Sequence, residues 1–98
     1  MTIHTSENGS ALTFEVIGRL DTITAPELEA ELSEHSGATD VTFDFSKLEY
    51  ISSAGLRVLL SEQKAMNSKA GKMVIKNVNA TIMEVFGITG FIDILTIE

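Results

Sequence analysis

Two adjacent serines, Ser52 and Ser53, are the residues of this 98-residue sequence whose type and position best suit a chemical role. They follow a predicted loop after the strand at 41–45 and stand where a helical pattern of apolar residues begins, so we expect them at the start of a helix. A helix N-terminus has unpaired N–H groups and a partial positive charge, which both favour a phosphate group. This helix entrance is therefore a candidate binding site for a phosphate group. The alternative is that Ser52 or Ser53 only caps the helix.

Other reactive groups give weaker indications. Serine catalysis needs a histidine that a carboxylate orients beside the serine. His4 lies in the first predicted strand and His35 near the end of the first predicted helix, so we interpret both as surface or structural residues. The sequence has no cysteine, and the phosphate-binding pattern G-x-x-x-x-G-K-[ST] is absent. We expect no enzymatic activity, no catalytic residue, no cofactor and no metal ion.

The charge distribution limits the classes of partner. The chain has 7 basic and 14 acidic residues and a net charge of −7. Residues 1–50 hold ten acidic and two basic residues, whereas residues 51–98 hold four and five. Nucleic acids and anionic membrane surfaces both attract basic proteins, so we expect no nucleic-acid partner and no direct membrane contact. No apolar run approaches the ~18 residues of a membrane span, and no export signal is visible, which favours a cytoplasmic location.

A β-hairpin and an alternation of helices and strands are predicted to position the serines. Residues 2–6 and 10–17 read as strands, and Asn8-Gly9 between them is typical of a hairpin turn. The elements predicted after the hairpin are helices at 24–37, 52–70 and 79–86, the last capped by Asn79 and closed by Gly87, and strands at 41–45, 72–76 and 92–97. Such alternation indicates crossover connections and a largely parallel central sheet. The length suits one domain with a single core.

The first predicted helix has distinct entry and surface features. Thr24 and Glu27 have the spacing of a capping box, and Ile23 and Leu28 occupy the positions of a hydrophobic staple. The helix is also strongly acidic; the residues concerned are Glu27, Glu29, Glu31 and Glu34. This acidic face is interpreted either as a solvated surface or as an interaction surface.

Three motifs resemble those of a known family. The segment Asp44-Phe45-Ser46-x-Leu48-x-Tyr50-Ile51-Ser52-Ser53-Ala54-Gly55-Leu56 resembles the signature of the STAS domain, which bacterial anti-sigma factor antagonists share. The stretch Gly18-Arg19-Leu20-Asp21-x-x-Thr24-Ala25 resembles the earlier G-x-L-D turn of the family. The segment Val85-Phe86-Gly87-Ile88-Thr89-Gly90-Phe91 is similar to its C-terminal pattern. The motifs occur in the family's order and cover nearly the whole chain.

The resemblance implies a single α/β STAS domain over residues 1–98, with a mixed sheet of four or five strands and helices packed mainly on one side. It also implies a switch protein without catalytic activity. In this family the unmodified antagonist binds an anti-sigma factor that is also a serine kinase, and the sigma factor is released. The kinase then phosphorylates the antagonist, the complex dissociates, and a serine phosphatase reverses the modification.

By position in the motif, the resemblance identifies Ser53 as the phosphorylation site, with Ser52 as the second choice. Many antagonists carry aspartate where this sequence has Ser52, and serine or threonine where it has Ala54. The residues that the resemblance assigns to partner binding are Asp21, Thr24, Ser52, Ser53, Ala54, Gly55 and Arg57. For Asp21, a carboxylate that only stabilises its turn is the alternative. STAS domains also occur as subunits of membrane lipid transporters, in which the two serines would serve only as a helix cap.

Overall fold

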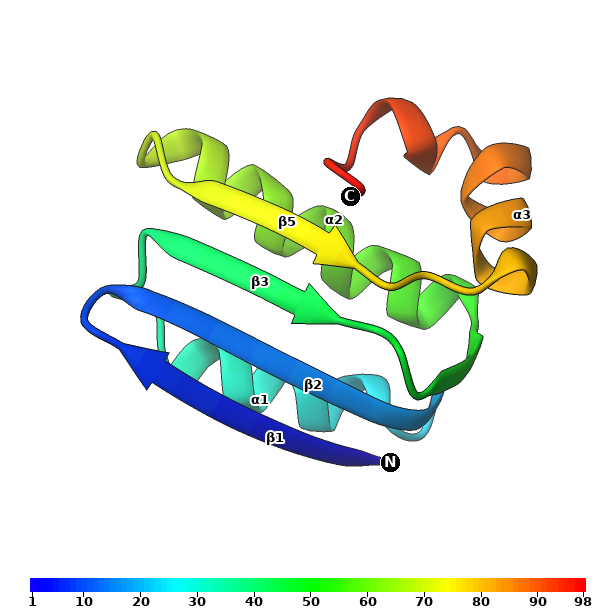
Figure 1. Cartoon of the computed structure of the whole chain (residues 1–98), viewed down its shortest axis with the longest axis horizontal. Coiled ribbons are helices and arrows are strands. Elements are labelled where there is room, and N and C mark those ends of the chain that lie inside the picture. The colour runs from blue at the N-terminus through cyan, green and yellow to red at the C-terminus, as the bar shows by residue number, and fades with distance from the viewer.

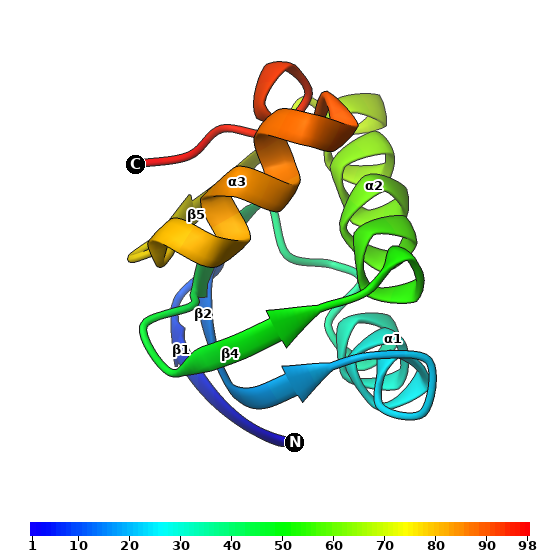
Figure 2. The same ribbon diagram turned by 90° about the vertical axis from the view of Figure 1, so that its right-hand side faces the viewer.

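The computed structural model describes all 98 residues as a sheet with helices on one face (Figure 1). The elements in chain order are β1 (Thr2–Asn8), β2 (Ala11–Leu20), α1 (Ala25–Glu34), β3 (Asp40–Asp44), β4 (Leu48–Ile51), α2 (Ser53–Ser68), β5 (Lys72–Lys76), α3 (Ala80–Thr89) and a 3-10 turn (Phe91–Asp93). Helices α1 and α2 lie side by side behind the sheet, whereas α3 lies at one end of it beside β4 (Figures 1 and 2). None of these helices has the length and apolar character needed to cross a membrane.

The sheet has five strands and is mixed, as predicted. The strand order is β1-β2-β3-β5, and β4 pairs with the far end of β2. The β1–β2 pair is antiparallel, and all other pairs are parallel. Strand β2 is long enough to serve two parallel neighbours: residues 11–15 pair with β3, and residues 18–20 pair with β4 after an irregularity at Gly18. This division of β2 brings β4, and the serines that follow it, to the sheet's end.

The core lies between the sheet and the two covering helices. Alternate residues of β2 and β3 point into it, and the rings of Phe14 and Phe43 stack with their centroids 5.6 Å apart. Leu28 of α1 and Leu59 of α2 are fully buried against this layer. Each such side chain contributes roughly 1.5–3 kcal/mol by leaving water, so the core holds the helix starts in fixed positions.

Asn79, the residue before α3 (Ala80–Thr89), links this helix to β4 by hydrogen bonding. The Asn79 side-chain oxygen accepts a hydrogen bond from the N–H of Ile82 at 2.8 Å, which confirms the predicted cap. The Asn79 amide group donates to the Leu48 carbonyl at 2.9 Å. The helix continues past Gly87 to Thr89, and Gly90, at φ +80°, ends it instead. The prediction that the helix ends at Gly87 is therefore wrong. A glycine can adopt ordinary helical geometry, and it then lies within a helix instead of ending it.

Three predicted features of the strands are wrong. The hairpin loop is Gly9-Ser10, with Gly9 at φ +66°, and Asn8 remains in β1 paired with Ala11. Residues 48–51 form β4, where the sequence indicated a loop, because Leu48 and Ile51 gain burial by pairing with β2. The last predicted strand, 92–97, is a 3-10 turn followed by a single bridge between Ile75 and Ile97.

Candidate functional site

The two serines lie at the junction of β4 and α2, next to the junction of β2 and α1. Leu20 and Ile51, the last residues of β2 and β4, are paired in parallel register. The Ser52 N–H continues this pairing by donating to the Leu20 carbonyl at 2.9 Å. Because the two strands are parallel, they end at the same edge, and α1 and α2 both begin there (Figure 2). Strand pairing thus places Asp21 and its turn beside the serines.

The two hydroxyl groups have different environments. Ser52 precedes α2 in an extended conformation, and its Oγ is buried without a hydrogen-bond partner. Ser53, the first residue of α2, is exposed, and no side-chain hydrogen bond of the structure involves it. The side chain of Ser52 also accepts no hydrogen bond from the N–H groups of α2. At this junction, only Ser53 presents a hydroxyl to the solvent.

Gly55 makes the close approach of α2 to the two strands sterically feasible. A Cβ atom on Gly55 would lie 2.7 Å from the Leu20 side chain and 2.9 Å from the Ile51 side chain. These separations are shorter than van der Waals contact, so a larger residue would require α2 or the Leu20 and Ile51 side chains to shift. Ala54 is half-buried beside the core and carries no hydroxyl. The absence of a side chain at Gly55 therefore lets α2, and the serines at its start, lie close to the strand ends.

Asp21 forms the turn that starts α1. Its Oδ1 accepts hydrogen bonds from the N–H groups of Ile23 at 3.0 Å and Thr24 at 3.1 Å. These bonds, of which that from the Thr24 N–H is the strongest influence, lower the pKa of the Asp21 carboxyl below its ordinary value. The Thr24 hydroxyl accepts from the Asp21 N–H at 2.8 Å and donates to the Arg19 carbonyl at 2.7 Å. The structure thus shows the turn-stabilising role that was the alternative for Asp21.

The predicted capping box and hydrophobic staple are wrong. The Thr24 side chain makes no capping bond to α1, because its hydroxyl is engaged with Asp21 and Arg19. Ile23 is 84% exposed and so cannot pack on the buried Leu28 as a staple. In place of the capping box and the staple, the Asp21 carboxylate accepts hydrogen bonds from the backbone just before α1. The spacing of these residues is compatible both with a capping box and with the Asp21 turn, and the structure shows the turn.

One pair of side chains beside the site has no counterpart among the features predicted from the sequence. The Arg19 guanidinium lies over the ring of Tyr50, 4.2 Å from its centroid. The same arginine Nε is 3.7 Å from Asp21 Oδ2. Arg19 and Tyr50 are register partners on β2 and β4, so their contact depends on the pairing of β4 with β2. Assignment of residues 48–51 to a strand would have indicated this pair.

Arg57 lies one helical turn beyond Ser53, next to a furrow between α1 and α2. The furrow has a volume of about 450 Å³, and Pro26 and Glu29 of α1 and Ala54 and Arg57 of α2 are among its lining residues. The Arg57 side chain is exposed and takes part in no ion pair or hydrogen bond of the structure. It is therefore a free cation close to the start of α2.

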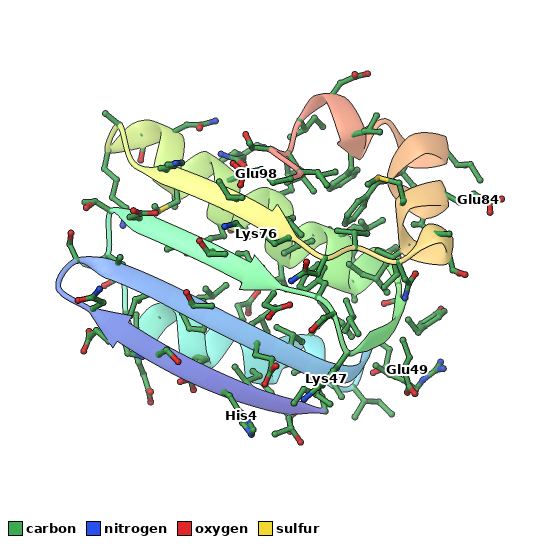
Figure 3. The ribbon with its side chains drawn as sticks, viewed as in Figure 1. His4, Lys47, Glu49, Lys76, Glu84 and Glu98 are labelled. Carbon is green, nitrogen blue, oxygen red and sulfur yellow. The ribbon has the colours of Figure 1, made fainter.

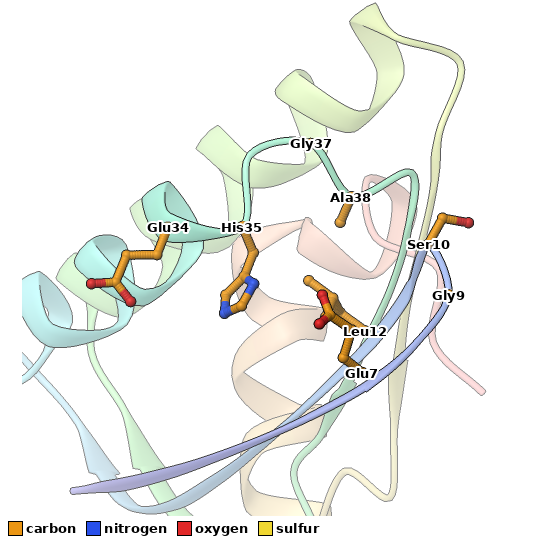
Figure 4. A pocket seen from close by; sticks show the side chains of 8 residues that line it. All are labelled: Glu7, Gly9, Ser10, Leu12, Glu34, His35, Gly37 and Ala38. Atoms are coloured by element: carbon orange, nitrogen blue, oxygen red, sulfur yellow. The ribbon is translucent and has the colours of Figure 1, made fainter.

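A separate hollow of about 260 Å³ lies at the opposite end of α1, away from the serines (Figure 4). His35 lies at its wall and packs edge-on against the Phe14 ring, with 5.8 Å between the centroids. His4 is exposed on β1, and its Nδ1 is 3.3 Å from Glu15 Oε1 (Figure 3). Neither histidine contacts a serine of the β4–α2 junction. No group of three or more histidine and acidic side chains is arranged to hold a metal ion.

The sequence pattern that defines the STAS domain matches residues 2–98. The chain belongs to the STAS domain family. Among curated relatives of this STAS domain is BtrV of Bordetella bronchiseptica, named as a candidate anti-sigma factor antagonist. It is 38% identical over 82 residues, which cover 82% of this chain and 71% of BtrV. The anti-sigma-B factor antagonist of Staphylococcus aureus is 29% identical over 100 residues, covering 100% of this chain and 93% of the relative.

Solved structures show the same fold. The anti-sigma factor antagonist SpoIIAA in its unphosphorylated form matches with a TM-score of 0.80 and 17% identity, over 99% of this chain and 87% of SpoIIAA. The Bacillus SpoIIAA in its phosphorylated form matches with a TM-score of 0.79 and 20% identity, over 99% of this chain and 91% of the other. At these identities the similarity is one of fold, and it confirms the predicted mixed α/β architecture.

Proposed function

We propose that this STAS domain is an anti-sigma factor antagonist whose binding is controlled by phosphorylation of Ser53. The unmodified domain binds an anti-sigma factor that is also a serine kinase, and the sigma factor is released. Phosphorylation of Ser53 by that kinase ends the interaction, and a serine phosphatase restores it. The names of the relatives support the general role. The observation that carries the finer proposal is the exposed, unbonded hydroxyl of Ser53 at the first residue of α2.

The environments of the two hydroxyls favour Ser53 over Ser52 as the phosphate acceptor. A kinase must bring the γ-phosphate of ATP into line with the attacking oxygen, so that oxygen must be accessible. The Ser53 side chain meets this requirement, whereas Ser52 Oγ is enclosed. Transfer of the phosphoryl group to Ser52 would require the junction of β4 and α2 to open first.

A phosphate on Ser53 is expected to disturb the interface rather than the fold. It adds a charge of about −1.5 to −2 at pH 7. At a helix N-terminus a negative charge is favourable by ~0.3–1 kcal/mol, so α2 can keep its position. At the centre of a contact, the same charge must lose its hydration or face an unpaired group of the partner, which costs several kcal/mol. Dissociation of the complex therefore needs no conformational change.

Phosphate mapping tests this proposal directly. The domain is incubated with ATP and the anti-sigma factor kinase of its own organism, and the modified peptide is identified by mass spectrometry. We expect one phosphate on Ser53 in the unaltered domain and in Ser52→Ala, and none in Ser53→Ala. Phosphate on Ser52, or no phosphate on any residue, would contradict the assignment.

The other role considered, a constitutive subunit of a membrane lipid transporter, requires the serines to act only as a helix cap. The Ser52 side chain accepts no N–H of α2, and the Ser53 hydroxyl points to solvent without a partner. Neither serine therefore has the hydrogen bond that such a capping role would need. No observation at the site favours the transporter role over the phosphorylation switch.

A further inference from the structure

The chain has two arginines, and both lie near the start of α2. They differ in whether the guanidinium group has a partner. Arg19 is already engaged: its guanidinium covers the Tyr50 ring at 4.2 Å and its Nε is 3.7 Å from an oxygen of Asp21. Arg57 is exposed and has no ion-pair partner, although acidic residues outnumber basic ones by 14 to 7. The Arg57 guanidinium is therefore available to form an ion pair with a new negative charge near the start of α2.

Helix geometry relates Arg57 to Ser53. Both residues lie in the continuous helix α2, four residues apart. Side chains at positions i and i+4 lie on the same face about one turn apart, within reach of each other. An acidic group at the N-terminal position and a basic group at the C-terminal position is the favourable order for such a pair. A phosphate on Ser53 and the Arg57 guanidinium would have this order.

We propose that Arg57 is the intramolecular partner of the phosphate on Ser53. This inference rests on the proposed function, because it assigns a role to Arg57 only in the phosphorylated state. Guanidinium groups bind phosphate through two parallel hydrogen bonds, which makes arginine better suited to this role than lysine. Arg57 is also among the residues assigned to partner binding. Phosphorylation of Ser53 would therefore change the partner-binding residues in two ways. It adds negative charge at Ser53, and it engages the Arg57 guanidinium, which is then no longer available to the partner.

The other charged groups near Arg57 do not prevent this pairing. Glu29 of α1 lines the same furrow, but its carboxylate is not within ion-pair distance of Arg57. Asp21, in the neighbouring turn, is held by two backbone N–H groups and by Arg19. A dianionic phosphate on the same helix face competes well with the single charge of Glu29 for the guanidinium.

The titration of the phosphate itself tests the pair. Phosphoserine is installed at position 53 during translation, so that no kinase or partner protein is needed, and the ³¹P signal is followed from pH 4 to pH 8. Arg57 stabilises the dianion, so the phosphate should titrate at a lower pH in the unaltered domain than in Arg57→Gln. We expect a difference of roughly 0.2–0.4 pH units at low salt, shrinking in concentrated salt. Arg57→Lys should lie between the two.

Lys64→Gln supplies the matched control, because it removes one exposed positive charge from α2 eleven residues beyond Ser53. Its phosphate should titrate as in the unaltered domain, and circular dichroism should show the same helix content in all variants. Coincident titrations of the unaltered domain and Arg57→Gln would overturn the pair, as would an equal effect of Lys64→Gln. These outcomes leave the acceptor assignment intact. Failure of a kinase to modify Ser53 would instead refute the proposed function without changing the titration result.

Discussion

At the scale of single residues, the proposed switch depends on a difference between two neighbouring hydroxyl groups. Ser52 and Ser53 are chemically identical, yet one oxygen is enclosed and the other is exposed. The backbone causes this difference, because Ser52 continues the pairing with Leu20 while Ser53 begins α2. The side chain of Ser52, which has an extended backbone, is directed into the junction, and that of the following residue, Ser53, points away from it.

Substitution of Ser53 should separate binding from its control. Ser53→Ala should bind the anti-sigma factor about as tightly as the unaltered domain and should keep binding after incubation with kinase and ATP. Phosphorylation of the unaltered domain should weaken binding on the order of a thousandfold, which corresponds to about 4 kcal/mol. Ser53→Asp, with less charge than a phosphate, should show a smaller loss. Isothermal titration calorimetry measures these affinities, and equal affinity of all forms would refute the switch.

The Asp21 carboxylate should make the stability of the domain depend on pH. Its pKa is lowered in the folded protein, mainly by the Thr24 N–H. A lowered pKa means that the ionised form stabilises the fold above the ordinary value of 3.8, and that this contribution is lost as the pH falls through the folded-state pKa. The melting temperatures of the unaltered domain and Asp21→Asn should therefore differ at pH 6 and converge as the pH falls below 3.8 and through the lowered folded-state pKa. A constant difference over this range would contradict the role of the charge.

At the scale of the elements, two glycines within helices differ in whether they have space for a side chain. A Cβ atom added to Gly55 in α2 would lie closer than 3 Å to the Leu20 and Ile51 side chains, whereas one added to Gly87 in α3 would meet nothing within 4 Å. A methyl group is therefore excluded at the first position and tolerated at the second. The contrast shows that α2 is pressed against the strand ends at Gly55, while α3 faces open space at Gly87.

The two glycine-to-alanine substitutions should thus change stability in opposite directions. Gly55→Ala should destabilise the domain by roughly 1–3 kcal/mol, because α2 must move away from Leu20 and Ile51. Gly87→Ala should be neutral or stabilising by up to about 1 kcal/mol, because alanine is the better helix former. Urea denaturation followed by circular dichroism gives both values. A stable Gly55→Ala with an unmoved α2 would show that the packing tolerates the methyl group.

The cap of α3 should also matter to β4. Asn79→Ala removes both the capping bond to the Ile82 N–H and the bond to the Leu48 carbonyl. We expect a loss of about 1–2 kcal/mol in the free energy of unfolding. Asn79→Ser keeps a capping oxygen but does not reach Leu48 as the amide does, so it should recover part of the loss. Full recovery by serine would show that the bond to β4 contributes nothing.

At the scale of the whole molecule, the proposed phosphate acceptor, Ser53, lies at an edge where strands and helices meet. Strands β2 and β4 end side by side, the core holds α1 and α2 behind the sheet, and both helices start at the same edge (Figures 1 and 2). The Ser53 side chain can gain a charge there without displacing any buried group. A phosphate on Ser53 is therefore expected to change the surface of the domain while the fold stays the same.

Phosphorylation should accordingly leave the architecture unchanged. Amide chemical shifts in the phosphorylated domain should move only around the start of α2 and the neighbouring Asp21 turn, and not in β1, β3 or α3. The melting temperature should change little or rise slightly, since a negative charge at a helix N-terminus is favourable. Shift changes spread over the sheet, or a large fall in melting temperature, would indicate a conformational switch instead of a blocked surface.

The sequence alone determined the types of most elements, the hairpin, the strand at 72–76, the Asn79 cap and the family motifs that point to Ser53. These features depend on contacts within a few residues or on patterns of burial that repeat along the chain. The tertiary structure alone decided that residues 48–51 form a strand, that Arg19 covers Tyr50, and that Arg57 stays free. It also decided that Ser52 is enclosed and Ser53 exposed. The strand at 48–51, the contact of Arg19 with Tyr50 and the different positions of the two serines depend on the register between β2 and β4, whose paired residues lie about thirty positions apart, and no local pattern encodes that register.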